Sequence, residues 1–121
     1  MIRRVSAGLV SLIVVIWAIA VAGAGAASGA RTIDLYSSLA LQGASSAQTI
    51  PLVNGIKLAL SQANYMAGDF TVHYMSLDDS TAAAGAWDPA QTSANARRVA
   101  SDRRAVFYIG EFNSGASEVS I

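Results

Sequence analysis

The sequence has no cysteine and only one histidine among its 121 residues. Without cysteine the chain has no thiol nucleophile, no disulfide, no iron–sulfur cluster and no cysteine to carry a lipid anchor. A single histidine excludes a metal centre built from several histidines. We therefore expect neither thiol chemistry nor a metal site of this kind, and we expect no cofactor.

Charged residues are also scarce, at 13% of the chain, and they are unevenly placed. Residues 5–30 carry no charge, whereas residues 31–121 carry six basic and eight acidic side chains, a net charge of −2. A nucleic-acid-binding protein needs a basic face or stripe, and this slightly acidic body has none in its sequence. The charge pattern predicts no nucleic-acid partner, and the length allows one domain at most.

The first 30 residues have the three parts of a secretory signal peptide. Arg3 and Arg4 supply a positive start, residues 9–21 form an apolar run, and residues 22–30 are rich in alanine and glycine. We predict a signal peptide over 1–30, with the mature chain starting between Gly25 and Arg31. The alternative is an uncleaved anchor, because residues 5–30 are long enough to span a bilayer. In both cases the body is exported, to the periplasm or the cell surface.

The body alternates between strand and helix patterns, which predicts an α/β fold with a doubly wound parallel sheet in the order β-α-β-α-β(-α). The expected strands are 32–37, 69–77 and 105–109, and the expected helices run from about 51 to 66, from 89 to about 104, and from 115 onward. In such sheets ligands bind beyond the carboxyl ends of the strands. The segments 38–49, 78–88 and 110–117 are therefore expected to build any site.

Local signals give more detailed expectations for these elements. Thr49 should cap the first helix, Pro51 should lie in its first turn, and Gly68 should end it. Asp88 to Gln91 should form a capping box for the second helix. The buried helix faces should comprise Leu52, Val53, Ile56, Ala59, Leu60 and Ala63 in the first helix, and Ala90, Ala94 and Val99 in the second. The continuous apolar run 105–109 is typical of a fully buried parallel strand.

Few side chains in the body suggest catalysis. His73 is best interpreted as a hydrogen-bonded sheet residue, and Asp78 with Asp79 as carboxylates that organise a loop. Ser114 lacks the flanking glycines of a hydrolase nucleophile elbow. Its hydroxyl could instead bind a carboxylate or simply cap a helix, and local sequence leaves both readings open. Trp87 and Phe112 could line a pocket, although isolated aromatics beside loops more often fill the core.

An ordered set of short motifs in the body carries a resemblance to a known family. The motifs are Leu-Ala-Leu-Gln-Gly (39–43), the helix 52–60, Leu-Asp-Asp (77–79), Trp-Asp-Pro (87–89), Ala-Asn-Ala-Arg (94–97) and Tyr-Ile-Gly-Glu-Phe-Asn-Ser-Gly-Ala-Ser (108–117). Together they resemble the N-terminal lobe of type I periplasmic solute-binding proteins of branched-chain amino acid ABC transporters. The resemblance covers about residues 32–121.

The resemblance implies a function and a set of ligand-binding residues. Such proteins are exported, bind an amino acid or a similar small solute between two lobes, and deliver it to a membrane permease. Ser114 matches the serine that hydrogen-bonds the ligand carboxylate, and Gly115 and Ala116 match the adjoining backbone. The predicted ligand-binding residues are Phe112, Asn113, Ser114, Gly115, Ala116 and Gln48. Gln48 stands where an aromatic residue is common, and Ala40 and Ala44 replace prolines of the first ligand loop.

The resemblance also implies that 31–121 is the N-terminal part of a leucine-binding-protein-like domain whose second lobe is absent from this sequence. We expect such a truncated lobe to bind its solute weakly and to leave the edge of strand 105–109 unpaired. The alternative within the same fold is a ligand-sensing ectodomain that feeds a signalling partner. An α/β enzyme is disfavoured, because no nucleophile and base are paired in the sequence.

Overall fold

A computed structural model describes residues 31–121, and the predicted signal peptide or anchor lies outside these residues. The elements are β1 (Arg31–Leu39), a short 3-10 turn η1 (Gly43–Ser45), α1 (Ser46–Gln62), β2 (Met66–Ala67), β3 (Phe70–Asp78), β4 (Ser80–Thr81), β5 (Ala86–Trp87), α2 (Pro89–Ser101), β6 (Ala105–Ile109) and α3 (Ser114–Ser120). None of the helices formed by residues 31–121 is both long and apolar enough to span a bilayer.

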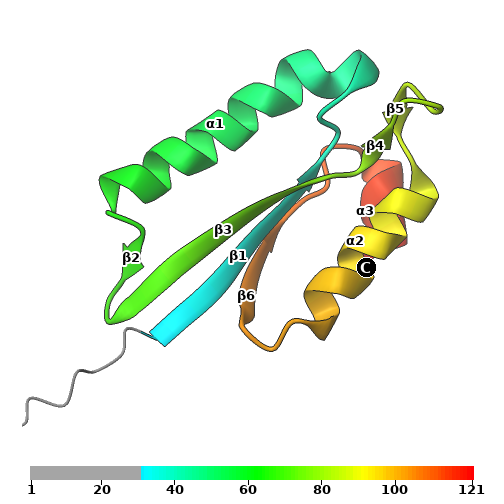
Figure 1. Cartoon of the computed structure of the whole chain (residues 1–121). Coiled ribbons are helices and arrows are strands. Elements are labelled where there is room, and N and C mark those ends of the chain that lie inside the picture. Colours follow the sequence, from blue (N-terminus) through cyan, green and yellow to red (C-terminus); the bar gives the residue numbers. More distant parts are fainter. Residues whose placement is uncertain (1–30) are drawn as a thin grey trace, which may run out of the picture.

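The main sheet has the order β2-β3-β1-β6 and confirms the predicted fold class. β1 pairs in parallel with β3 on one side and with β6 on the other, while β2 is a short antiparallel addition to β3. The chain steps outward from β1 in both directions, and right-handed crossovers then place α1 and α2 on opposite faces of the sheet. Figure 1 shows α1 on one side of the strands and α2 on the other.

The central strand β1 supplies much of the buried core. Its partners run in register from Arg31 opposite Phe70 to Leu39 opposite Asp78. Exposure decreases along the strand, and its second half, from Tyr36 to Leu39, is fully buried. The carboxyl end of β1 therefore lies inside the molecule, and the loops that follow the strands are built around it.

The first helix begins earlier than its cap signal indicated. α1 starts at Ser46, so Thr49 and Pro51 lie within the helix and not at its start, which corrects the expected boundary. The Thr49 side chain is fully buried, and its hydroxyl donates to the carbonyl of Ala40, which anchors the helix to the end of β1. A threonine that caps a helix and one that bonds back to an earlier carbonyl have the same local sequence signature.

The end of α1 also differs from the prediction. The helix stops at Gln62, and the chain turns through left-handed residues at Asn64 and Tyr65. Gly68, predicted as the helix cap, has a φ of +60° in the two-residue turn between β2 and β3. Glycine supports both conformations equally well, so the residue type alone did not separate a helix cap from a hairpin turn.

The buried faces of both long helices were only partly predicted. In α1, Val53 is buried and Ile56 and Leu60 are half-buried, but Leu52, Ala59 and Ala63 are exposed. In α2 the buried residues are Thr92 and Asn95, whereas Ala90 and Ala94 are exposed and Val99 is half-buried. The face of α2 that meets the sheet is therefore polar, and a search for apolar periodicity could not find it.

The start of α2 follows its local signal. Asp88 is the N-cap, and its carboxylate accepts hydrogen bonds from the N–H groups of Ala90 and Gln91, with Pro89 in the first turn. The capping box is only half formed, because the Gln91 side chain donates to Asn95 and the Asp88 N–H donates to Asp79. The helix ends at Ser101, two residues before the expected pair of arginines.

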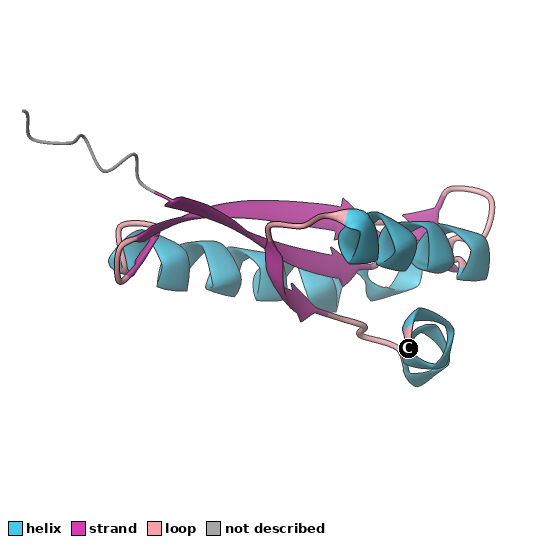
Figure 2. Ribbon diagram, turned by 90° about the horizontal axis from the view of Figure 1, so that it is seen from below, coloured by secondary structure: helices cyan, strands magenta, loops and turns pink. Residues whose placement is uncertain are grey.

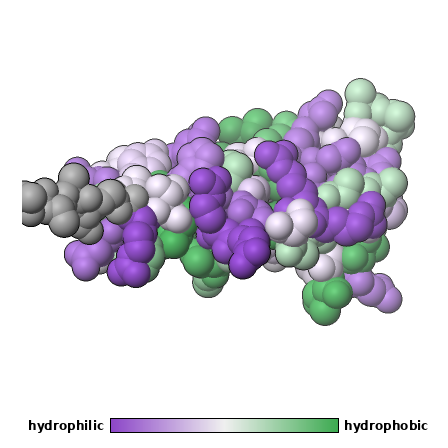
Figure 3. All heavy atoms as spheres, turned by 60° about the horizontal axis from the view of Figure 1, so that its bottom comes forward, coloured by the Kyte–Doolittle hydropathy of each residue, from purple (hydrophilic) through white to green (hydrophobic). Residues whose placement is uncertain are grey.

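The boundaries of β6 match the prediction, but its burial does not. β6 lies at the edge of the sheet among the described residues, as expected for the unpaired strand, and its second edge has no partner there. Val106 is 58% exposed and Phe107 is 61% exposed, so the strand is not fully buried. On the face shown in Figure 3 hydrophilic surface predominates, and apolar groups are interspersed and protrude at its margins.

The last helix, α3, begins at Ser114, one residue before the expected start. It packs against α2. Figure 2 shows α3 set beyond the carboxyl end of β6, at the end of the loop that leaves this strand. This position brings the start of α3 to the edge of the sheet where the loops after β1 and β3 also lie.

Candidate functional site

Two of the three predicted edge segments are bound tightly to each other. The loop after β1 meets the β4–β5 hairpin, which follows β3, and the Ala44 N–H donates to the Gly85 carbonyl at 3.1 Å. Gly43 has a φ of +70°, and a Cβ on it would lie 1.9 Å from the same carbonyl oxygen. Only glycine fits this contact, so the backbones of the two segments touch directly.

Asp78 organises this contact from the end of β3. Its carboxylate accepts hydrogen bonds from the Leu41 N–H at 3.0 Å, from the Gln42 side chain at 2.9 Å, and from the N–H and hydroxyl of Ser80. Partial burial opposes the charge, but the hydrogen bonds from Ser80, Leu41 and Gln42 outweigh it and lower the pKa of Asp78. The loop-organising interpretation of Asp78 is confirmed.

Asn95 joins α2 to the ends of β1 and β3, and this role was not predicted from the sequence. Its side-chain amide donates to the Ser38 hydroxyl at 3.1 Å and to the Asp78 carbonyl at 2.9 Å, and the residue is 5% exposed. The two partners are 57 and 17 residues away in the chain, so no local pattern indicates the contact. An asparagine in the middle of an alanine-rich helix is the one available hint, because buried amides need partners.

The third edge segment carries most of the predicted ligand-binding residues. Ser114 is exposed at the first position of α3, and among residues 31–121 its hydroxyl makes no hydrogen bond. Gly115 packs on the Trp87 ring, where a Cβ would lie 3.0 Å from the nearest ring carbon. Ala116 is fully buried. The structure thus places Ser114 at the surface and fixes its two neighbours against the body.

The other two residues of this segment flank the helix start. Asn113 occupies the N-cap position without a side-chain capping bond, and its Oδ1 atom is buried with no partner among the described residues. Phe112 is 38% exposed, so it does not fill the core. Trp87 is half-buried and supports α3 instead of standing free in a pocket.

Gln48 is placed differently from the expectation. Residues 43–45 form a 3-10 turn and α1 begins at Ser46, so most of the predicted first ligand loop is helical. Gln48 is exposed in the first turn of α1, and within the described residues its amide makes no hydrogen bond. The observed connection between β1 and its helix is therefore short, because the buried Thr49 hydroxyl holds the helix against the end of β1.

A buried pair of carboxyl groups lies beside the predicted ligand segment. Asp79 is 1% exposed, and neither of its carboxyl oxygens has a hydrogen-bond partner among residues 31–121. Burial and then the close approach of the Glu111 carboxyl raise the pKa of Asp79 to about 8. Glu111 Oε1 accepts a hydrogen bond from the Tyr108 hydroxyl, while its Oε2 is buried and unpartnered in the same part of the chain. Asp79 was predicted to organise a loop together with Asp78, and this was wrong for Asp79, because both of its carboxyl oxygens lack donors among residues 31–121. Glu111 was not predicted to have a role.

The single histidine belongs to a separate ion-pair network. His73 Nδ1 lies 3.1 Å from Asp34 Oδ1, and Arg104 holds the other oxygen of Asp34 through Nε at 3.0 Å and a terminal nitrogen at 2.9 Å. Asp34 is fully buried, so the Arg104 guanidinium compensates its charge and His73 lies within hydrogen-bonding distance of its other oxygen. His73 is a hydrogen-bonded sheet residue, as predicted, and it does not activate Ser114.

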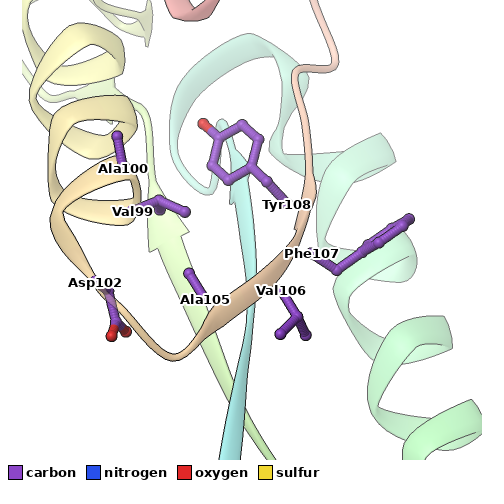
Figure 4. A pocket seen from close by; sticks show the side chains of 7 residues that line it. All are labelled: Val99, Ala100, Asp102, Ala105, Val106, Phe107 and Tyr108. Atoms are coloured by element: carbon purple, nitrogen blue, oxygen red, sulfur yellow. The ribbon is translucent and has the colours of Figure 1, made fainter.

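Two hollows lie beside β6, away from the predicted ligand-binding residues. One, of about 300 Å³, is lined by the end of α2 and by β6, and a second, of about 180 Å³, lies between α2, β6 and α3. Figure 4 shows Val99 and Tyr108 directed into the space between α2 and β6, while Phe107 points away from it. Within residues 31–121, no group of three or more acidic or histidine side chains is arranged to hold a metal ion.

Comparison with known proteins supports the fold. No family model and no curated protein matches the chain. Among solved structures, the chain is similar to one described as a possible leucine/isoleucine/valine-binding protein from Rhodopirellula baltica SH 1, with a TM-score of 0.60 and 22% identity. The match covers 76% of this chain and 24% of that one, so this chain spans about a quarter of the length of its structural neighbour. Residues 31–121 therefore have an α/β fold with a mostly parallel sheet, like part of a periplasmic-binding-protein lobe.

Proposed function

We propose that this chain carries part of the N-terminal lobe of an exported solute-binding protein that serves an ABC transporter for branched-chain amino acids or related amides. The proposal combines the ordered motifs of residues 39–117 with the similarity to a possible leucine/isoleucine/valine-binding protein. Residues 1–30 would direct export, and the partners would be the solute and a membrane permease. Solute binding, not catalysis, is the proposed activity.

The observation that carries the proposal is the exposure of the Ser114 hydroxyl without a hydrogen-bond partner in residues 31–121. Its hydroxyl is exposed and has no partner among the described residues, and it lies at the start of the helix that follows β6. Hydroxyl groups bind carboxylates through charge-assisted hydrogen bonds, which are about twice as strong as neutral ones. In the proposed role, Ser114 donates to the carboxylate of the bound amino acid, while Phe112, Asn113, Gly115 and Ala116 form the adjoining surface.

A single lobe is expected to bind this ligand weakly. Two-lobed binding proteins close both surfaces over the solute and exclude water, whereas one surface leaves the solute half solvated. Losing half of the contacts removes about 4 kcal/mol, or about a thousandfold in affinity. We therefore expect residues 31–121 on their own to bind the solute with millimolar affinity.

The test is a binding titration with leucine, isoleucine and valine, followed by NMR of the labelled chain. Ser114→Ala should weaken binding about tenfold or more, because a charged carboxylate loses one hydrogen bond. The matched control is Ser101→Ala, an exposed serine at the end of α2, which should bind as the unaltered chain does. Equal affinity of Ser114→Ala and Ser101→Ala would contradict the assignment of Ser114.

A further inference from the structure

The buried carboxyl pair joins a fixed part of the molecule to the segment that carries Ser114. Asp79 belongs to the fixed part, because its N–H donates to the Leu39 carbonyl at 3.3 Å and its own carbonyl accepts from the Asp88 N–H at 2.7 Å. Glu111 belongs to the loop between β6 and α3, three residues before Ser114. An interaction between these two side chains therefore acts directly on the position of the ligand segment.

Without a shared proton, the carboxyl oxygens of Asp79 and Glu111 do not have enough hydrogen-bond donors. Tyr108 donates to Glu111 Oε1, and burial followed by the bond to Glu111 raises the pKa of Tyr108, so this hydroxyl stays a donor at every physiological pH. Three carboxyl oxygens remain buried and unpartnered among the described residues, namely Asp79 Oδ1, Asp79 Oδ2 and Glu111 Oε2. Unpaired buried acceptors are costly, and one proton held between two carboxyl groups satisfies an oxygen of each.

The charged side chains that act on the Asp79 carboxyl are acidic, namely Glu111 and Asp78. Asp78 at the end of β3 adds a further negative charge near Asp79, and the Asp88 carboxylate is directed to the first turn of α2. The residues that α2 and α3 bury are Thr92, Asn95 and Ala116, and none of these three side chains is titratable. The Tyr108 hydroxyl is the remaining titratable neighbour.

We infer that Asp79 and Glu111 are positioning residues for the Ser114 segment, and that they hold it on the body by sharing one proton between their buried carboxyl groups. When the proton is present, an O–H···O hydrogen bond joins the loop to the end of β3. When the proton is lost to solvent, two buried anions face each other and repel. Because Asp79 is held by its backbone, the loop with Glu111 is the part that moves.

The pH range of this effect follows from the protonation of the native state. The pKa of Asp79 is raised from 3.8 to about 8, so the folded chain binds a proton that the unfolded chain has already lost above about pH 4. Stability therefore falls as pH rises from about 4 to about 8, and the pair separates as pH passes through about 8. The inference concerns the segment that the proposed function uses, but its test needs no ligand, so the two can fail separately.

Trp87 provides the readout, because Gly115 packs on its ring. The other tryptophan is Trp17, so all variants carry Trp17→Phe in the full chain. Tryptophan emission is followed from pH 6 to 9.5 in the parent chain, Asp79→Asn, Glu111→Gln and the exposed control Glu118→Gln. Both amide substitutions supply a permanent N–H donor between the two side chains and so remove the need for the shared proton.

The parent and Glu118→Gln should change emission with a midpoint near pH 8. Asp79→Asn and Glu111→Gln should each show no midpoint near pH 8, because neither variant can form two facing anions. If Asp79→Asn does not fold, the result for Glu111→Gln alone tests the shared proton. Constant emission of the parent over the whole range, or a parent midpoint that persists unchanged in Asp79→Asn or Glu111→Gln, would overturn the inference.

Discussion

The edge of the sheet at which the parallel strands end has two halves, and they differ in how fully their polar groups are hydrogen-bonded within the chain. Where the loop after β1 meets the β4–β5 hairpin, the Asp78 carboxylate has several donors and the backbones touch at Gly43 and Gly85. Where β6 leads into α3, carboxyl oxygens are buried without partners and the Ser114 hydroxyl faces solvent unpaired, among the residues described. The first half is complete in itself apart from the Asp79 carboxyl, which approaches Glu111, whereas the second half has hydrogen-bonding capacity left for a proton and a ligand.

The largest loss of stability is expected from disrupting the close contact between Gly43 and Gly85 in the first half. Gly43→Ala should destabilise the chain by about 3 kcal/mol or more, because the new Cβ meets the Gly85 carbonyl and φ is +70°. Gly55→Ala is the matched control, since its Cβ meets nothing within 4 Å inside α1, and it should stabilise by about 0.5–1 kcal/mol. Thermal unfolding of both variants measures the difference, and similar melting temperatures would show that the contact between the loops is not tight.

A smaller loss is expected from the carboxylate at the same corner. Asp78→Asn replaces an acceptor of the Gln42 amide by a donor and should cost about 1–3 kcal/mol. The pKa of Asp78 is lowered from 3.8, so its contribution is fully present above about pH 4 and is lost as pH falls through the lowered value. Denaturant unfolding between pH 2 and 7 should therefore show the two chains converging in acid. A constant gap between them across this range would contradict the role of the charge.

Substitution in the exposed strand β6 should have the smallest effect on stability. It should, however, have a clear effect on self-association. β6 has a free edge among the described residues and exposes Phe107, which favours edge-to-edge self-association. Phe107→Lys should change stability by less than about 0.5 kcal/mol and should lower the apparent mass in light scattering at high concentration. Leu58→Lys on α1, at 59% exposure, is the control. An equal reduction by both substitutions would attribute association to general hydrophobicity and not to the strand edge.

How far the sequence predicted each half depends on how local the determining contacts are. The fold class, the limits of β6 and the Asp88 cap follow from short patterns, and the structure confirms them. The burial of β6 was wrong, because a continuous apolar run does not reveal whether a strand is central or at an edge. The buried face of α2 was missed because Asn95 is satisfied by Ser38 and Asp78, which are distant in the chain.

The candidate site shows the same limit. Ser114 and its neighbours were identified by an ordered set of motifs, and their ligand-binding role stays a prediction. The pairing of Asp79 with Glu111 depends on two segments 32 residues apart that meet only after β3 and β6 have taken their places beside β1. Side-chain types alone gave no reason to connect them.

Amide hydrogen exchange of the whole chain, with and without a saturating concentration of leucine, tests the central claim most directly. We expect the Leu41, Gln42 and Ala44 amides to be protected in both conditions, because they donate to the Asp78 carboxylate, the Ser80 hydroxyl and the Gly85 carbonyl, respectively. We expect the amides of residues 112–115 to gain protection only when leucine is bound, whereas the Ala116 amide already donates to the Asn113 carbonyl. Unchanged exchange at residues 112–115 under saturation, or new protection confined to the hollows beside β6, would contradict the assignment of this segment as the ligand-binding surface.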